Sequence, residues 1–227
     1  MLYATKMFHN SIRFLVPFFV ILSAGASASP SIQGNLAWDS EYVDRGVRQS
    51  GSVLQPGIDL YAGKYYVGAA AFLEVDADFE EINLYGGTYR PLSPLLSLDL
   101  GLNLIQVDGT GDAEAYAGLV LEFGLNPAIY AFYEWEAETL SIEAALGSRI
   151  DLHPKLFLDW SLTAGGSLPE ASDSSSWAFV QGTLDLVYPL TNRVELSLGL
   201  RASSRDEDLN LPDSSHLWTG IGLRFDL

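Results

Sequence analysis

The chain of 227 residues has no cysteine, few basic residues and no long apolar run. Without cysteine there is no disulfide framework, no thiolate metal ligand and no thiol nucleophile. The 12 Lys and Arg stand against 29 Asp and Glu, a formal net charge of −17. This balance argues against nucleic acid as a partner, because phosphate binding needs clustered basic side chains. No apolar run reaches the roughly 18 residues that a membrane-spanning helix needs.

What the chain does contain is a positive mean hydropathy of +0.15 together with only 18% charged residues. Hydrophobic residues make up 48% of the chain, which argues against disorder. Apolar residues that are numerous but spread by alternation are typical of a transmembrane β-barrel. The length suits a single domain.

The N-terminus has the pattern of a secretory signal peptide. Lys6 and Arg13 precede and open an apolar run at 14–22, and an A-x-A cleavage site ends at Ala28. The run is too short to span a membrane as a helix. We therefore expect residues 1–28 to be removed after Sec-type export and residues 29–227 to form the barrel.

In the mature chain, apolar residues recur at every second position in short runs, which predicts β-strands with two different faces. No stretch with helical periodicity competes with them. The runs predict an all-β protein, a transmembrane antiparallel up-and-down barrel of 12 strands, with 10 or 8 as alternatives. The runs begin at Ile32, Leu54, Tyr65, Ile82, Leu96, Ala113, Ile129, Leu140, Leu156, Val180, Val194 and Leu217.

The connections alternate in character. One set is tight and carries Pro, Asn or Gly, the common turn residues; the other set is mostly longer, polar and acidic. Short periplasmic turns and longer outer loops are typical of a bacterial outer-membrane barrel, so we expect both termini to be periplasmic and Asp44 to Ser52 to lie outside. The turns are 63–64, 91–94, 126–127, 153–155 and 189–192, and the loops are 44–52, 76–80, 107–112, 137–139, 165–176 and 203–215.

Alternation alone does not distinguish a barrel from a soluble β-sandwich, whose strands also have one apolar and one polar face. The export signal, a final strand that runs to the C-terminus, and aromatic residues at both ends of the apolar face favour the barrel. We expect one aromatic girdle at the turn side (Tyr65, Phe123, Tyr188, Phe225) and one at the loop side (Trp38, Tyr42, Tyr133, Trp135).

The last run, Leu217 to Leu227, resembles the C-terminal strand that the outer-membrane assembly machinery recognises. Leu223 and Phe225 fit its alternation, although Leu227 stands where that signal usually has an aromatic residue. The resemblance implies the assembly machinery and the lipid bilayer of a Gram-negative outer membrane as partners.

A second resemblance lies at the start of the mature chain. The segment from Ser40 to Ser50, followed by Leu54 to Gly57, is similar to the opening of the TorF-type porins. The matching residues are Tyr42, Arg45, Gly46, Gln49 and Ser50, while Arg48 departs from the family pattern. The resemblance implies an outer-membrane barrel with a role in transport, and it names no substrate.

The polar face carries far more acids than arginines. A ring of carboxylates around water favours cations and repels anions, so we expect a lumen that prefers cations. Acids near the rims can equally be solvated groups without a function. Arg149 has Glu143 and Asp151 as same-face neighbours on its strand, and Arg224 has Asp226. The residues expected to line the lumen are Asp59, Asp99, Glu122, Glu143, Arg149, Asp159, Asp185, Glu195 and Arg201.

Two functions fit this pattern: a porin or narrow channel for small solutes, and a non-conducting structural or adhesive barrel that acts through its outer loops. Inward aromatic residues favour a narrow or plugged lumen over an open one. We expect no enzyme, because Ser215 and His216 are strand neighbours that point to opposite faces. We expect no cofactor; calcium on the acidic loops, at 76–81 and 206–208, stays open.

Overall fold

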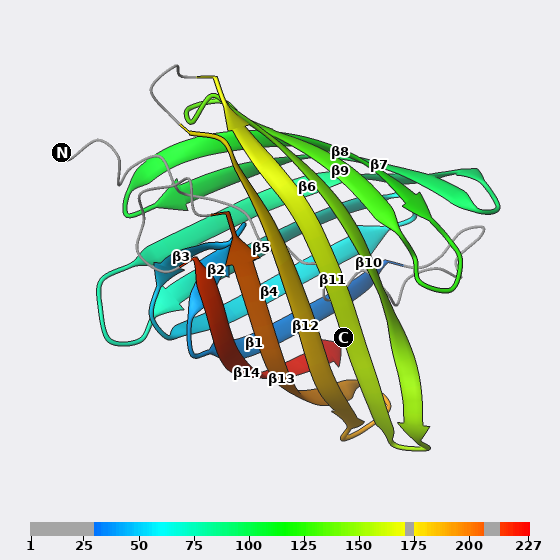
Figure 1. Ribbon diagram of the computed structural model, residues 1–227. Helices are drawn as coiled ribbons and strands as arrows, with labels where there is room; N and C mark the ends of the chain where they lie inside the picture. Colours follow the sequence, from blue (N-terminus) through cyan, green and yellow to red (C-terminus); the bar gives the residue numbers. More distant parts are fainter. Residues whose placement is uncertain (1–29, 171–174, 207–213) are drawn as a thin grey trace.

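The computed structural model describes residues 30–170, 175–206 and 214–227. The predicted signal peptide, residues 1–28, lies outside these described residues. Twelve strands form one closed antiparallel barrel, in which each strand pairs with its neighbours along the chain and β1 closes against β14 (Figure 1). Two further short strands, β2 and β3, pair only with each other. In the described part of the chain no helix is long and apolar enough to cross a membrane.

The barrel strands confirm the predicted count of 12, and the alternatives of 10 and 8 are wrong. They are β1 (Ser31–Asp39), β4 (Val53–Ala62), β5 (Tyr65–Glu74), β6 (Glu80–Ser93), β7 (Leu96–Val107), β8 (Thr110–Leu121), β9 (Ala128–Glu134), β10 (Thr139–His153), β11 (Leu156–Pro169), β12 (Trp177–Pro189), β13 (Val194–Arg205) and β14 (Ser215–Asp226); the separate pair is β2 (Tyr42–Asp44) and β3 (Val47–Ser50).

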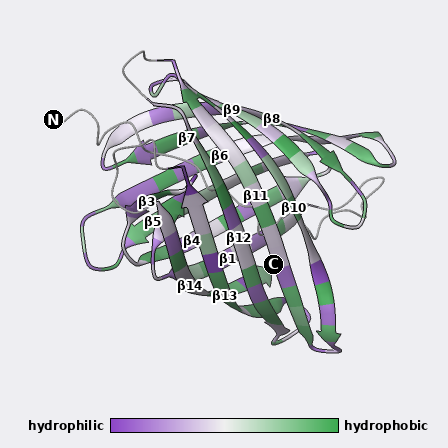
Figure 2. Cartoon of the chain, viewed as in Figure 1, coloured by the Kyte–Doolittle hydropathy of each residue, from purple (hydrophilic) through white to green (hydrophobic). Residues whose placement is uncertain are grey.

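The two faces of the wall differ sharply. Hydrophobic and hydrophilic bands alternate along the strands in Figure 2. The alternating leucines of β7 illustrate the outer face: Leu100, Leu102 and Leu104 are all exposed on the outside of the barrel, whereas Asp99 and Asn103, at the alternate positions of the same strand, are buried inside. This inversion of the usual arrangement, with leucines outside and carboxylates inside, suits a wall that faces lipid and encloses polar groups.

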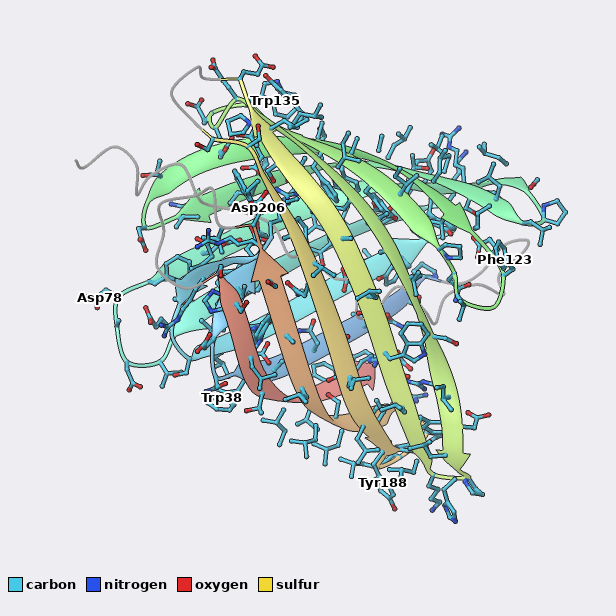
Figure 3. The ribbon with its side chains drawn as sticks, viewed as in Figure 1. Trp38, Asp78, Phe123, Trp135, Tyr188 and Asp206 are labelled. Carbon is cyan, nitrogen blue, oxygen red and sulfur yellow. The ribbon has the colours of Figure 1, made fainter. Side chains whose placement is uncertain are left out.

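The connections fall on two rims, as the sequence predicts. The residues labelled at the ends of the barrel in Figure 3 show this: Asp78, Trp135 and Asp206 lie toward one end, and Phe123 and Tyr188 toward the other. The expected loop at 107–112 is instead a tight hairpin. Asp108 and Gly109 both have positive φ (47° and 81°), the conformation that a two-residue turn between twisted strands requires.

One aromatic residue is misplaced by the sequence analysis. Tyr42, expected in the loop-side girdle, is buried inside the barrel, where its ring stacks on Phe72 with centroids 4.5 Å apart. The reason is that β1 ends at Asp39, so the alternation of the first strand does not continue to Tyr42. Tyr65, Phe123, Trp135 and Tyr188 are exposed on the outer surface.

The segment from Asp44 to Ser52 also differs from its prediction. Instead of an exposed outer loop, residues 42–50 form the β2–β3 hairpin, in which Tyr42, Val43, Asp44, Arg45 and Val47 are buried. The hairpin has no ladder with any barrel strand. Side chains, rather than backbone pairing, therefore hold it inside the barrel.

Candidate functional site

The barrel interior is built from charged and polar side chains with little access to water. Glu81, Asn83, Asn103 and Glu114 are at most 1% exposed. Burying such groups is costly unless each is paired or hydrogen-bonded. The interior therefore depends on a set of specific networks, and these decide how much open lumen remains.

The first network surrounds Arg45 at the tip of the hairpin. Its guanidinium forms ion pairs with Glu134 at 2.7 Å, Glu143 at 2.8 Å and Glu114 at 3.4 Å, which belong to β9, β10 and β8. The guanidinium carbon also lies 4.9 Å from the centroid of the Phe132 ring. Three carboxylates and one aromatic face thus enclose a single planar cation, the geometry for which guanidinium is suited.

The opposite wall holds the backbone of the same turn. Trp177 Nε1 donates a hydrogen bond to the Arg45 carbonyl at 3.0 Å, and Arg205 Nε donates one to the Gly46 carbonyl at 3.1 Å. Gly46 has φ of +78°, and a Cβ there would lie 2.9 Å from the Cβ atoms of Phe179 and Arg205. Only glycine fits this turn. The hairpin tip consequently bridges the interior from β8–β10 to β12–β13.

The hairpin carries one carboxylate that its surroundings do not satisfy. Asp44 is 2% exposed, and its Oδ1 has no hydrogen-bond partner among the described residues. Burial raises the pKa of Asp44 well above its usual 3.8; the attraction of Arg45 offsets only part of this, and Glu81 adds repulsion. Burial by itself lowers the pKa of Arg45, but the attraction of Glu143, Glu114, Asp44 and Glu134 together outweighs burial and raises it well above its usual value. Arg45 therefore stays charged, whereas ionised Asp44 is unfavourable.

A second network joins tyrosines to acids on the β4–β9 wall. Tyr66 and Tyr130 donate hydrogen bonds to the two carboxylate oxygens of Asp99, at 2.7 and 3.0 Å. Tyr85 donates to Asp59 in the same way. Tyr89 and Ser97 both donate to Glu122. These inward rings, as the sequence predicts, take up much of the interior on this side.

A third network lies toward the turn side. Arg149 forms ion pairs with Asp159 at 2.7 Å and Glu195 at 3.1 Å, and Arg224 lies 3.5 Å from Glu195. The expected same-strand pairs of Arg149 with Glu143 or Asp151, and of Arg224 with Asp226, are wrong. Arg149 stands directly opposite Asp159, and Glu195 directly opposite Arg224, in the strand register. Directly opposite residues are closer than residues two apart on one strand.

A fourth network is an ion triad. Arg201 lies 3.4 Å from Asp39 and 3.3 Å from Asp185. Beneath it, Gly199 and Gly220 face each other on β13 and β14. A Cβ on Gly220 would lie 1.8 Å from Asp39 Oδ1 and 2.7 Å from Arg201 Nη1. The two glycines therefore let the triad lie against the wall.

Between the triad and the hairpin a cavity of about 180 Å³ remains. It follows β1 from Gln33 to Asp39, continues to Glu41 beyond the end of that strand, and reaches β5 through Ala70 and Phe72. Its volume gives room for on the order of ten water molecules. Five carboxylates and two arginines line it: Asp39, Glu41, Asp59, Asp185, Glu195, Arg201 and Arg224.

The structure divides the residues expected to line the lumen into two groups. Asp59, Asp185, Glu195 and Arg201 border the cavity. The other five lie within the networks described above, away from the cavity lining: Asp99, Glu122, Glu143, Arg149 and Asp159. The family-like residues Tyr42, Arg45, Gly46, Gln49 and Ser50 all lie in the hairpin.

The buried hairpin is the part of the barrel interior that sequence reasoning missed. A signal for it is present, because Val43 and Val47 flank Arg45-Gly46 and give this polar segment an apolar character that an exposed loop does not need.

The histidine that the sequence analysis weighed lies near the loop side. His216 Nδ1 is 3.4 Å from Glu41 Oε2, and the His216 side chain is almost fully buried. Ser215, its neighbour, is exposed and shares a hydrogen bond with Ser204. Of the acidic loop at 206–208, Asp206 accepts a hydrogen bond from the Ala178 amide, and residues 207 and 208 lie outside the described residues.

Solved structures with a similar fold are outer-membrane barrels. The "KdgM porin in complex with disordered oligogalacturonate" is 7% identical, with 86% of this chain and 98% of that chain covered and a TM-score of 0.59. The NanC porin is 11% identical, with coverage of 86% and 100% and a TM-score of 0.59. An outer-membrane channel from Pseudomonas putida F1 is 10% identical, with coverage of 91% and 100% and a TM-score of 0.54.

No family model matches the chain, and no curated protein is a significant match. The resemblance to the TorF-type porins therefore stays a prediction. At 7–11% identity the structural likeness shows the fold alone. The chain is a closed 12-stranded antiparallel barrel, and its fold is similar to that of outer-membrane porins.

Proposed function

We propose that this protein is a narrow channel for small solutes in the outer membrane of a Gram-negative bacterium, with a preference for cations. The observation that carries the proposal is the lumenal cavity, which follows β1 from Gln33, near the turn side, and continues past the end of the strand to Glu41, near the loop side. A barrel wall with an apolar exterior needs a bilayer, and a polar cavity along the inside of that wall offers solutes a route.

The charges around the cavity support the preference for cations. Five carboxylates against two arginines leave an excess of negative charge. In physiological salt, screening limits the distance over which a charge acts to about 8 Å. An excess of negative charge therefore makes a lumen selective only if the lumen is narrow. The hairpin and the tyrosine network keep the lumen narrow. Among the described residues, both arginines of the cavity are already paired with carboxylates, Arg201 with Asp39 and Asp185 and Arg224 with Glu195, so they do not favour acidic solutes.

The N-terminal signal pattern supports Sec-type export with removal of residues 1–28. β14, which runs from Ser215 to Asp226 and closes the barrel against β1, supports recognition of the C-terminal strand by the assembly machinery. The apolar outer face supports residence in the lipid bilayer. The role proposed is transport and not catalysis.

A specific observation favours a second function, a non-conducting barrel that acts through its outer loops. The hairpin tip bridges the interior and is held at both ends by buried contacts. If this tip never moves and the cavity does not reach both rims, the barrel is closed.

Current through the purified protein in planar bilayers decides between the two. We expect steps of small conductance and, across a KCl gradient, a reversal potential of the sign that a cation current gives. Anion-selective current would contradict the charge argument. Absence of current at all voltages would favour the loop-mediated function.

A further inference from the structure

We propose that the pocket which encloses Arg45 is a binding site for the guanidinium group of a small organic cation, and that Arg45 is a tethered occupant that competes with the solute for this site. The proposal rests on the proposed channel function and names its class of solute. The pocket is formed by Glu114, Glu134 and Glu143 with the face of Phe132.

The pocket belongs to the barrel wall and not to the hairpin. Its three carboxylates come from three adjacent strands, and Glu114 pairs directly with Glu134 in the register of β8 and β9. Continuous ladders of β8 with β9 and of β9 with β10 fix their positions. The wall therefore presents the same acceptors whether or not the hairpin tip is in place.

The occupant, in contrast, is held against the wall by individual side-chain contacts and not by strand pairing. The β2–β3 pair has no ladder with the barrel. The Asp44 carboxylate is buried and its Oδ1 accepts no hydrogen bond from the described residues, which raises the free energy of the docked hairpin. The docked hairpin is thus a state that a competing ligand can displace.

A second observation points to a ligand beyond Arg45. The pocket wall continues into Asn103, which is paired with Glu114 across β7 and β8 and is fully buried. Asn103 donates to Asn83, but its Oδ1 accepts no hydrogen bond from the described residues. This gives a buried acceptor on the wall beyond those that Arg45 uses. A solute with more N–H donors than one arginine side chain would satisfy it.

Charge sets the ligand class. Glu114, Glu134, Glu143 and Asp44 are all buried around Arg45. The carboxylate oxygens lie 2.7–3.4 Å from the guanidinium nitrogens, and the centroid of the Phe132 ring lies 4.9 Å from the guanidinium carbon. This arrangement suits a planar guanidinium better than a spherical ammonium. The class is therefore small guanidinium compounds rather than anions or neutral sugars.

Calorimetry with methylguanidinium on the detergent-solubilised barrel tests the proposal. Arg45→Ala empties the pocket and leaves the wall intact, so it should bind methylguanidinium at least about tenfold more tightly than Arg48→Ala, a control that removes an exposed arginine of the same hairpin. Arg45→Lys should not bind, because a cation stays in the pocket. Adding Glu134→Gln to Arg45→Ala should weaken binding about tenfold.

Tetramethylammonium, which has the charge but no N–H donor, should not replace methylguanidinium. Equal binding of both cations, or equal binding by the Arg45→Ala and Arg48→Ala variants, would overturn the proposal. Folding is checked by heat-modifiable gel mobility. If Arg45→Ala does not fold, recovery of the folded band with methylguanidinium but not with tetramethylammonium would support the site, and no recovery would overturn it. Because binding needs no current, a barrel that binds but does not conduct would refute only the proposed channel.

Discussion

Replacing Arg201 by Ala tests the electrostatics of the lumen most sharply. Arg201 borders the cavity and neutralises Asp39 and Asp185, at 3.4 and 3.3 Å. A unit charge about 5 Å from a permeating ion contributes roughly 0.8 kcal/mol in water, and screening at physiological salt reduces this by about half. Losing the positive charge favours cations by about 0.4 kcal/mol and disfavours anions by the same amount. The permeability ratio of K⁺ to Cl⁻ should therefore rise about fourfold.

The same substitution should also weaken the barrel. Removing one member of a buried ion triad leaves two carboxylates without a counterion. The triad lies on a cavity wall that water can reach. The expected loss in the free energy of unfolding is therefore about 2 kcal/mol, less than the loss when a buried ion pair is broken in a dry interior. Urea unfolding followed by gel mobility measures this change.

The matched control is Arg90→Ala, which removes an exposed arginine at the turn end of β6. It should change neither the reversal potential nor the free energy of unfolding by more than the error. An unchanged or lower permeability ratio for Arg201→Ala, or an equal shift for Arg90→Ala, would refute the view that the triad faces the ion path.

Three further predictions follow from the same structure. Asp44→Asn should stabilise the barrel at neutral pH by about 1–3 kcal/mol. Because the pKa of Asp44 is raised in the folded state, the wild type loses stability as pH rises from 3.8 through the raised pKa. In urea unfolding, the stability difference between variant and wild type should therefore vanish near pH 3.8 and grow toward neutral pH. Glu195→Gln should lower the K⁺ to Cl⁻ permeability ratio about fourfold and cost at most about 1 kcal/mol of stability, because its pair with Arg149 is partly exposed. An epitope tag inserted at Gly109 should be reachable by antibody on intact cells and one at Pro154 should not; the reverse result would invert the topology.

The sequence predicts the wall of this barrel well because one simple rule governs it. Lipid outside and polar groups inside impose period two on every strand, so runs such as Leu96 to Leu104 reveal both the strand and its faces. The count of 12 follows from those runs. The interior cannot be obtained in this way, since period two says which face a side chain has and not which partner it meets.

The charge pairs show the limit clearly. Arg149 meets Asp159 because the turn at 154–155 sets the register of β10 against β11, and same-strand spacing contains no such information. The hairpin shows a second limit. Tyr42 continues the alternation of the first strand in the sequence, but the strand ends at Asp39 and the chain folds inward around Arg45. Whether a polar loop extends outward or enters the lumen depends on carboxylates contributed by β8, β9 and β10.

The reversal potential of the wild-type protein across a KCl gradient in a planar bilayer tests the central claim most directly. A cavity lined by five carboxylates and two arginines should pass a small current whose reversal potential has the sign of cation flow. A current that reverses with the sign of anion flow, or no current at any voltage, would contradict the account of this barrel as a cation-preferring channel.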